Sequence, residues 1–289
     1  VIHRRQRQMC IRDRSNRLPI LFLPGDTYAN RMPDPVLQQV EQFNNPSTTA
    51  NDAFKPVTRY FDRITRPEQI IQSFQIAVQT MLDPADCGPA CISLSQDIQG
   101  QTFDYPAEFF QEKVHTIRRP RPDEFQIKEA ADKIKSSKNP IIISGGGVFY
   151  SDAMEELSQF AIKHNIPVTQ TVMGYSTMKR DHSHFAGQIG GLGGKNTNTL
   201  AKKTDLAIAV GTKLADFTTG SWANFENENF KLVSINVSRY DANKHLAQAV
   251  VGDAKVSLTE LSQALGDWKA GEDWNKNCLL YTSPSPRDP

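Results

Sequence analysis

Glycines grouped behind short apolar runs are the residues in this sequence whose spacing could do chemistry. Residues 140–150 read PIIISGGGVFY, an apolar run followed by glycines, which is how a dinucleotide-binding unit begins. The fingerprint G-x-G-x-x-G needs a third glycine, where this sequence has Tyr150, and an acidic residue after the next strand, where IPVTQTV has none. The sequence therefore predicts a nucleotide-type fold whose dinucleotide site is absent or unused.

A second glycine cluster, Gly190 to Gly194, precedes the helical pattern NTNTLAKK and places Lys195 where a phosphate could meet the start of a helix. The Walker A spacing fails, because Asn196 follows the lysine where Ser or Thr is required. A mobile loop at the carboxyl edge of a sheet is the favoured interpretation. The tetrapeptide DHSH at 181–184 lacks a further set of metal ligands, so it is interpreted as a solvated turn.

The two ends of the chain share a feature at the level of their coding DNA. MCIRDR, at 9–14, can be encoded by ATGTGTATAAGAGACAGA, and CLLYTS, at 278–283, by TGTCTCTTATACACATCT. These strings are reverse complements over most of their length, as expected of one sequencing adapter read in opposite orientations. Residues 1–14 and 278–289 are therefore expected to be adapter-derived and are left out of the fold prediction.

Composition limits the possible functions once those ends are set aside. Without their six arginines and two aspartates, 27 basic and 30 acidic residues remain, a net charge of about −3 that gives no case for nucleic acid. Cys87 and Cys91 alone make neither a disulfide framework nor a metal site. No apolar run approaches the roughly 20 residues that span a bilayer, so neither a membrane nor a nucleic-acid partner is expected and a cytoplasmic location is the default.

The elements that must position these residues alternate between two kinds of pattern. Helical periods with one apolar face occupy 70–82, 154–161 and 256–265, the second with Ser151 or Asp152 as its expected N-cap. This alternation predicts an α/β fold with a parallel sheet covered on both faces. A linker is predicted near 115–125, where prolines and charges replace the apolar period. Short β-rich runs lie at 19–23, 90–94, 140–144, 166–171, 205–210 and 231–237.

Residues 16–268 resemble thiamine diphosphate enzymes of the acetolactate synthase superfamily. Five stretches carry the resemblance: LPILFLPGDTYANRMPDPVLQQVE, NDAFKPVTRYFDRITRPEQI, DPADCGPACISLSQDIQ, ISGGGVFYSDA and VGTKLADFTTGSW. The texts LPGDTYANR and KLADFTTGSW point to a hydrolytic branch that opens the ring of a polyol diketone in inositol catabolism.

The resemblance implies how the chain is divided. Residues 15–113 would be the C-terminal part of a truncated pyrimidine-binding domain, and 114–123 a linker. Residues 124–268 would be a complete Rossmann-like central domain with a doubly wound parallel sheet, and 269–277 the start of the next linker. Relatives form homo-oligomers, so the parent protein is expected to be a dimer or tetramer.

The resemblance also implies which parts of the site are present. The parent would use thiamine diphosphate and Mg²⁺. The catalytic glutamate and the metal-binding motif of the family match nothing in this sequence, so no catalytic residue and no bound cofactor are expected in this chain. FAD is not expected in the central domain. The sequence GDT at 25–27 with Asn51 downstream imitates the metal motif. It lacks the second glycine, so no metal is assigned to it.

Three residues remain as candidates. By resemblance, Phe54 would reach the cofactor pocket, with core packing as the alternative. Lys55 beside it would contact substrate, with a solvated surface lysine as the alternative. Gln96 stands where related synthases carry a lysine, and its neutral amide suits a polyol substrate.

Two other functions stay open at this point. A carboligase like acetolactate synthase would share the superfamily pattern, and a non-catalytic dinucleotide-binding module would share the central domain. Gln96 and the LPGDTYANR text favour the hydrolase over the carboligase, and titration with FAD and NAD would separate the module.

Overall fold

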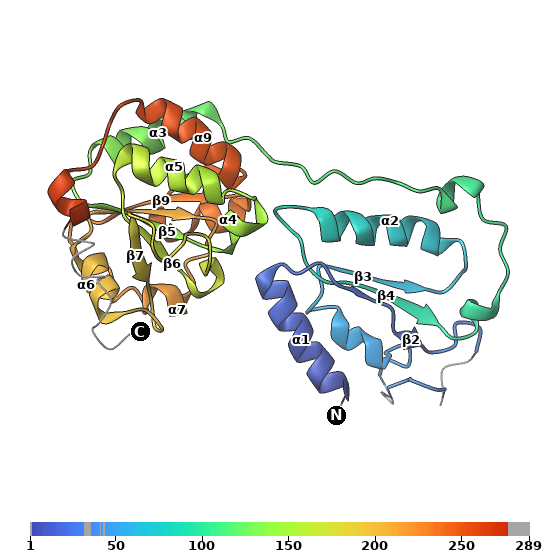
Figure 1. The fold of residues 1–289 in the computed structure, drawn as a ribbon. Helices are drawn as coiled ribbons and strands as arrows, with labels where there is room; N and C mark the ends of the chain where they lie inside the picture. The colour runs from blue at the N-terminus through green and yellow to red at the C-terminus, as the bar shows by residue number, and fades with distance from the viewer. Residues whose placement is uncertain (1, 32–35, 41, 43, 277–289) are drawn as a thin grey trace. The chain divides into compact units, whose positions relative to one another are not determined.

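The computed structural model describes residues 2–31, 36–40, 42 and 44–276 of the chain. The chain divides into two compact units, Val1–Arg118 and Arg119–Pro289, and the division falls inside the stretch predicted to be a linker (Figure 1). No helix among the described residues is long and apolar enough to cross a membrane. The two units are described separately.

The first unit is built around one strand, β4 (Ala90–Ser95), with parallel neighbours on both sides. The strand β3 (Tyr60–Ile64) pairs along one side, with Tyr60 opposite Ala90. On the other side β1 (Leu21–Phe22) and β2 (Gly25–Asp26) pair with β4 one after the other. Pro24, which has no N–H, lies between β1 and β2 and accepts a hydrogen bond from Leu94 N through its carbonyl.

The helix α2 (Gln69–Leu82) covers this sheet with the apolar face that its sequence predicts. Ile70, Ala77 and Met81 pack against sheet residues that include Ile64 and Ile92. Phe74 was predicted to share this face but is 38% exposed, and its ring lies edge-on to Phe109 instead. Phe109 belongs to the 3₁₀ helix η3 (Ala107–Phe110), and the unit also contains η2 (Ile98–Gly100).

The N-terminal residues left out of the fold prediction form a helix, α1 (Ile2–Asn16). Its Cys10 is fully buried in a cluster with Phe54, Val57 and Cys91. A helix-competent segment beside an uncovered apolar sheet face buries that face whatever its origin, because burial of apolar area is not directional. The helix α1, most of which was left out of the fold prediction, therefore takes part in the packing of the first unit through Cys10. The adapter origin of residues 1–14 stays a prediction.

The second unit is a six-stranded, wholly parallel sheet in the order β10-β9-β8-β5-β6-β7. This is the order of a doubly wound Rossmann-like sheet, and it confirms the predicted fold class. The order in which strands are added reverses between β5 and β8, and this is the position where such folds bind ligands. The strands are β5 (Pro140–Ser144), β6 (Val168–Gln170), β7 (Phe185–Gln188), β8 (Leu206–Val210), β9 (Lys231–Asn236) and β10 (Gln248–Val251).

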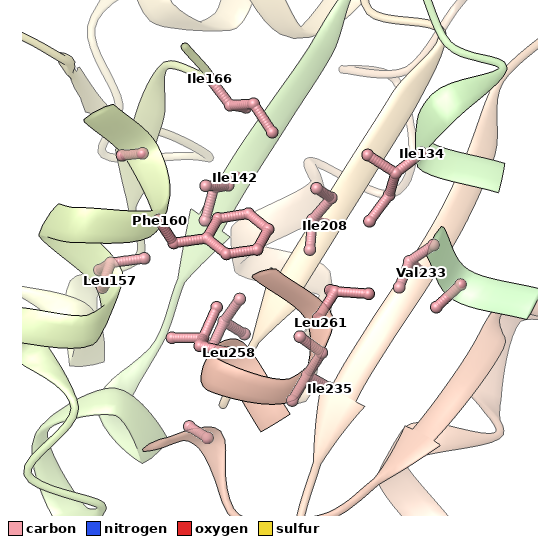
Figure 2. Close-up of a cluster of buried hydrophobic side chains, with 14 of the residues drawn as sticks. Ile134, Ile142, Leu157, Phe160, Ile166, Ile208, Val233, Ile235, Leu258 and Leu261 are labelled. Carbon is pink, nitrogen blue, oxygen red and sulfur yellow. The ribbon is translucent and has the colours of Figure 1, made fainter. Parts of the chain in front are cut away.

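Helices cover both faces of this sheet (Figure 1). Three of them, α3 (Glu124–Lys135), α5 (Met154–His164) and α9 (Ala254–Leu265), form the larger core, in which Phe160 packs among residues such as Ile142 and Leu258 (Figure 2). The helix α6 (Lys195–Lys203) covers the other face. Shorter helices are α4 (Gly146–Tyr150), η4 (Val172–Gly174), α7 (Asp216–Thr219), α8 (Arg239–Ala242) and η5 (Lys244–Leu246).

One local expectation was wrong. The N-cap of α5 is Ala153, because Ser151 ends α4 and Asp152 takes a left-handed turn with φ 51°. Past residue 268, where the central domain was predicted to end, side chains still pack against this unit. Trp274 is buried, and its Nε1 donates to the carbonyl of Pro140 at 2.8 Å.

Candidate functional site

The candidate residues Phe54 and Lys55 lie at the end of one short helical turn, η1 (Ala50–Phe54). Thr49 begins it with a reciprocal cap, in which Asn51 N donates to Thr49 Oγ1 at 3.2 Å and Thr49 N donates to Asp52 Oδ2 at 2.8 Å. This cap fixes the turn and hence the positions of both candidates.

Phe54 is 4% exposed, and its ring stacks on Phe22 with centroids 6.1 Å apart. It shares its cluster with Cys10 and Cys91, so within this unit the ring is a core residue. Burial in these apolar surroundings raises the pKa of the Cys91 thiol to about 12.

Lys55, by contrast, has an exposed side chain. Its ammonium lies 2.8 Å from Asp52 Oδ1 and 5.4 Å from the centroid of the Phe61 ring. The lysine is therefore held by a carboxylate and an aromatic face while its charge stays accessible to a solute.

A network of ion pairs and hydrogen bonds around Arg63 holds this turn against the sheet. This network was not predicted from the sequence. Arg63, on β3, donates from Nε to Asp26 Oδ2 at 2.7 Å and from Nη2 to Asp52 Oδ1 at 2.9 Å. Ser93 donates to the same Asp26 oxygen at 2.5 Å. Arg63 thus joins the end of β2 to the turn that carries Lys55. The adjacent charged residues Asp62 and Arg63 inside the strand YFDRI could have indicated it.

The pKa of Asp26 reflects this network. Burial works to raise the pKa, but hydrogen bonds from Ser93, Arg63 and the backbone of Thr27 outweigh burial and lower it. The Asp52 pKa is also lowered, since the contacts from Lys55, Thr49 and Arg63 outweigh its desolvation. Both carboxylates are therefore held in the charged form.

Asp26 and Asn51, the pair that imitates a metal motif, do lie close together. Asn51 Nδ2 donates to Gly25 O and to Ser93 Oγ, each at 2.7 Å. The amide therefore turns its nitrogen toward the centre of the network, and the Asp26 carboxylate is already neutralised by a guanidinium. These residues do not fit a divalent cation, which needs oxygen ligands. Nowhere in the described part of the chain do three His, Cys, Asp or Glu residues gather as a metal site.

Gln96 lies in the turn directly after β4 and is exposed at the carboxyl end of the strand. The neighbouring Asp97 accepts hydrogen bonds from Ala29 N and Asn30 N, both at 2.9 Å, and so fastens the loop that follows β2. Gln96 is therefore exposed to solvent at the carboxyl end of β4, whereas the ammonium of Lys55 lies over the ring of Phe61.

In the second unit, the glycines of 145–147 pack against the loop after β8. Gly145 N donates to Val210 O and Gly147 N to Gly211 O, both at 2.9 Å. A Cβ on Gly145 would lie 2.4 Å from Gly211 O, and one on Gly147 2.6 Å from Gly211 Cα. The glycines thus permit two loops to touch, and the N–H groups of Gly145 and Gly147 are taken by backbone carbonyls. That no dinucleotide binds here stays a prediction, which titration with FAD and NAD would test.

The loop at 190–194 and the turn at 181–184 have similar structural explanations. Gly191 N donates to Phe217 O at 2.8 Å, and Gly190 N to Asn198 Oδ1 at 3.0 Å. His182 Nε2 pairs with Ser158 Oγ at 2.9 Å, while its Nδ1 accepts from His184 N at 3.1 Å. Both features hold the unit together internally.

The sheet order, the closed glycine loop and the two-unit division match one class of protein. Residues 127–261 match the family model described as "Thiamine pyrophosphate enzyme, central domain". The second unit therefore contains a thiamine pyrophosphate enzyme central domain.

Relatives with a more specific name align with most of this chain. A protein of Clostridium perfringens, named 3D-(3,5/4)-trihydroxycyclohexane-1,2-dione hydrolase, is 47% identical over 250 residues, which are 86% of this chain and 39% of that protein. Proteins of the same name from Bacillus velezensis (46% over 268 residues) and Halalkalibacterium halodurans (47% over 261 residues) each align with 90% of this chain. The chain spans about two fifths of the length of these relatives: 39%, 42% and 41% respectively.

Proposed function

We propose that this chain is part of a thiamine diphosphate-dependent hydrolase that breaks a C–C bond and opens the ring of 3D-(3,5/4)-trihydroxycyclohexane-1,2-dione. The observation that carries the proposal is the 47% identity to relatives of that name over 250 residues, a length that requires both units to take part. Ring opening would then serve the breakdown of inositol.

When bound, thiamine diphosphate supplies a carbanion that adds to a ketone carbonyl and stores its electrons. The part proposed for this chain is to hold the substrate. The exposed Lys55, fixed by Asp52, and the exposed amide of Gln96 are suited to hydrogen bonds with hydroxyl and ketone oxygens. Phe54 would act behind Lys55 by keeping the turn in place, since its ring is buried.

Mg²⁺ on the cofactor diphosphate is part of the proposal, but the described residues do not hold it. Asp26 and Asn51 are committed to Arg63, Ser93 and Gly25, as described above. We infer that the catalytic glutamate and the metal ligands belong to parts of the parent protein that this chain does not include. The parent is proposed to be a cytoplasmic homo-oligomer.

The proposal is tested on the whole parent protein, after its coding sequence has been recovered. With thiamine diphosphate and Mg²⁺ supplied, it should open the cyclic diketone and lose this activity when the cofactor is withheld. Condensation of pyruvate in place of ring opening would replace the proposal with a carboligase. Micromolar binding of NAD or FAD by the unit 119–276, with no activity in the parent, would favour a dinucleotide-binding module.

A further inference from the structure

The second unit has a cavity of about 440 Å³. It lies at the end of the sheet away from the glycine loops. Lys231 begins β9, and His245 and Leu246 precede the start of β10, so the cavity lies at the amino ends of these strands. Ligands in Rossmann-like sheets bind at the carboxyl ends. A function at this cavity would therefore be separate from the site that the fold usually provides.

One wall of the cavity is aromatic. The ring of Trp222 lies 4.6 Å from that of His245 and 6.5 Å from that of Phe230, centroid to centroid, and all three residues line the cavity. Trp222 is half-buried against the core of the unit, which leaves part of the indole open to a ligand. Such a wall suits a flat ring.

The rim of the cavity is positively charged. Lys133, in the last turn of α3, and Lys231 line it, while no Asp or Glu in the described part of the chain does. Within the described residues, no hydrogen bond or ion pair engages either ammonium group. Glu129, one turn before Lys133, accepts a hydrogen bond from Gln248 Nε2 at 2.8 Å. Two cationic groups therefore face the cavity without a carboxylate partner there.

The two loops that border the cavity carry backbone strain. Ser221 and Trp222 have φ of 54° and 68°, and His245 and Leu246 have 61° and 57°. These are left-handed conformations that are unfavourable for residues other than glycine. These conformations bring the rings of Trp222 and His245 together at an interplanar angle of 58°, and strained residues of this kind concentrate at binding sites. Leu246 is 100% exposed.

We propose that this cavity binds a small organic anion that carries a flat ring. The ring would lie on Trp222, and the anionic group would lie between the ammonium groups of Lys133 and Lys231. Binding is non-covalent and does not depend on the proposed hydrolase activity, because every residue involved belongs to the second unit.

The test uses the full chain and adenosine 5′-monophosphate as the probe, followed by calorimetry and tryptophan fluorescence. The probe should bind and quench fluorescence, whereas adenosine, which lacks the charge, and inorganic phosphate, which lacks the ring, should each bind at least about tenfold more weakly. The double variant Lys133→Gln/Lys231→Gln should lose about tenfold or more in affinity, and Trp222→Leu should lose both binding and quenching.

Lys195→Gln is the matched control, because it removes a lysine at the carboxyl edge, and it should bind the probe like the unchanged chain. Melting curves establish that each variant is folded. The proposal is overturned if the probe fails to bind at millimolar concentration. It is equally overturned if Lys195→Gln abolishes binding that the Lys133/Lys231 variant retains.

Discussion

Arg63 forms ion pairs with both Asp26 and Asp52, so the first unit should depend on it for stability. Replacing it with methionine leaves the fully buried Asp26 carboxylate without its cation. Removing one partner of a buried ion pair costs about 3–5 kcal/mol, so Arg63→Met should lower the free energy of unfolding of the first unit by that amount. Arg66→Met is the control, because the Arg66–Glu68 pair is exposed and worth less than about 1 kcal/mol. Urea denaturation measures both, and equal effects would contradict this role for Arg63.

His164 should make the stability of the second unit depend on pH. It is fully buried and bonded to Trp268 O at 2.7 Å and Ser262 Oγ at 2.9 Å, and desolvation lowers its pKa below the usual 6.5. The unfolded chain therefore takes up the proton first, so this stability is complete above pH 6.5 and is lost as the pH falls below it.

The comparison is between the unchanged chain and His164→Gln, which cannot take up a proton. The melting temperature should fall less between pH 7.5 and pH 5.5 in the variant. Any contribution from His184, whose pKa is also lowered by burial, is present in both chains and cancels. An equal fall in both chains would exclude His164 as the source.

At the scale of elements, the N-terminal helix α1 covers one face of the first sheet. Cys10 on this helix shields Cys91, which is fully buried in β4. Deleting residues 1–14 should therefore open the cluster around Phe54 and speed the alkylation of Cys91, since access and ionisation both control thiol reactivity.

Peptide mapping by mass spectrometry after a timed exposure to iodoacetamide gives the rate at each cysteine. Cys87 is the internal control, because it is already partly exposed and its thiol donates to Met81 O. Its rate should change much less than that of Cys91 when residues 1–14 are deleted. If Cys91 stays unreactive after the deletion, other residues cover it.

Strong periodic patterns could be predicted from the sequence, and weak ones could not. The strand β5 has the predicted bounds, and α5 and α9 bury most of their predicted faces, because an apolar run or stripe has one favourable solution. The helix α2 turns its predicted face to the sheet but leaves Phe74 exposed. The strands β2, β3, β7 and β10 were missed. They are short or interrupted by polar residues, so their pairing depends on neighbours distant in sequence.

The site shows the same limit. Lys55 and Gln96 could be proposed from resemblance, and the structure places both side chains at the surface of the first unit. The contact of Arg63 with Asp26 spans 37 positions, and no local pattern encodes it. The positive φ angles of the four residues at the Trp222 cavity could not be predicted from the sequence pattern either, since the surrounding packing imposes their conformation.

On the scale of the whole molecule, the second unit should fold by itself when its bounds follow the packing. Arg119 contacts Asp253 and the carbonyl of Ser151, and Ala270 and Trp274 belong to the two cores. The predicted domain, 124–268, omits all of these contacts. Loss of Trp274 alone should cost about 3 kcal/mol, so 124–268 should melt about 6–12 °C below 119–276.

Calorimetry on the two purified segments checks this expectation. A single transition for 119–276, with calorimetric and van't Hoff enthalpies in agreement, would show an independent cooperative unit. Trp274→Ala in the longer segment is the matched control and should account for much of the difference. Equal melting temperatures for the two segments would mean that residues 119–123 and 269–276 add no stability.

The order of strands in the second sheet also has a consequence for how the chain is synthesised. β5 is a central strand, but one of its two neighbours, β8, comes much later in the sequence: Pro140 pairs with Leu206. β8 pairs in turn with β9. While the polypeptide leaves the ribosome, β5, β6 and β7 can assemble first, with one long edge of β5 still open. That edge is completed only when β8 emerges, and contacts so distant in sequence slow folding. During translation the half-built sheet therefore exposes backbone that can pair with another nascent chain, which makes this interval the one in which a chaperone has most to protect.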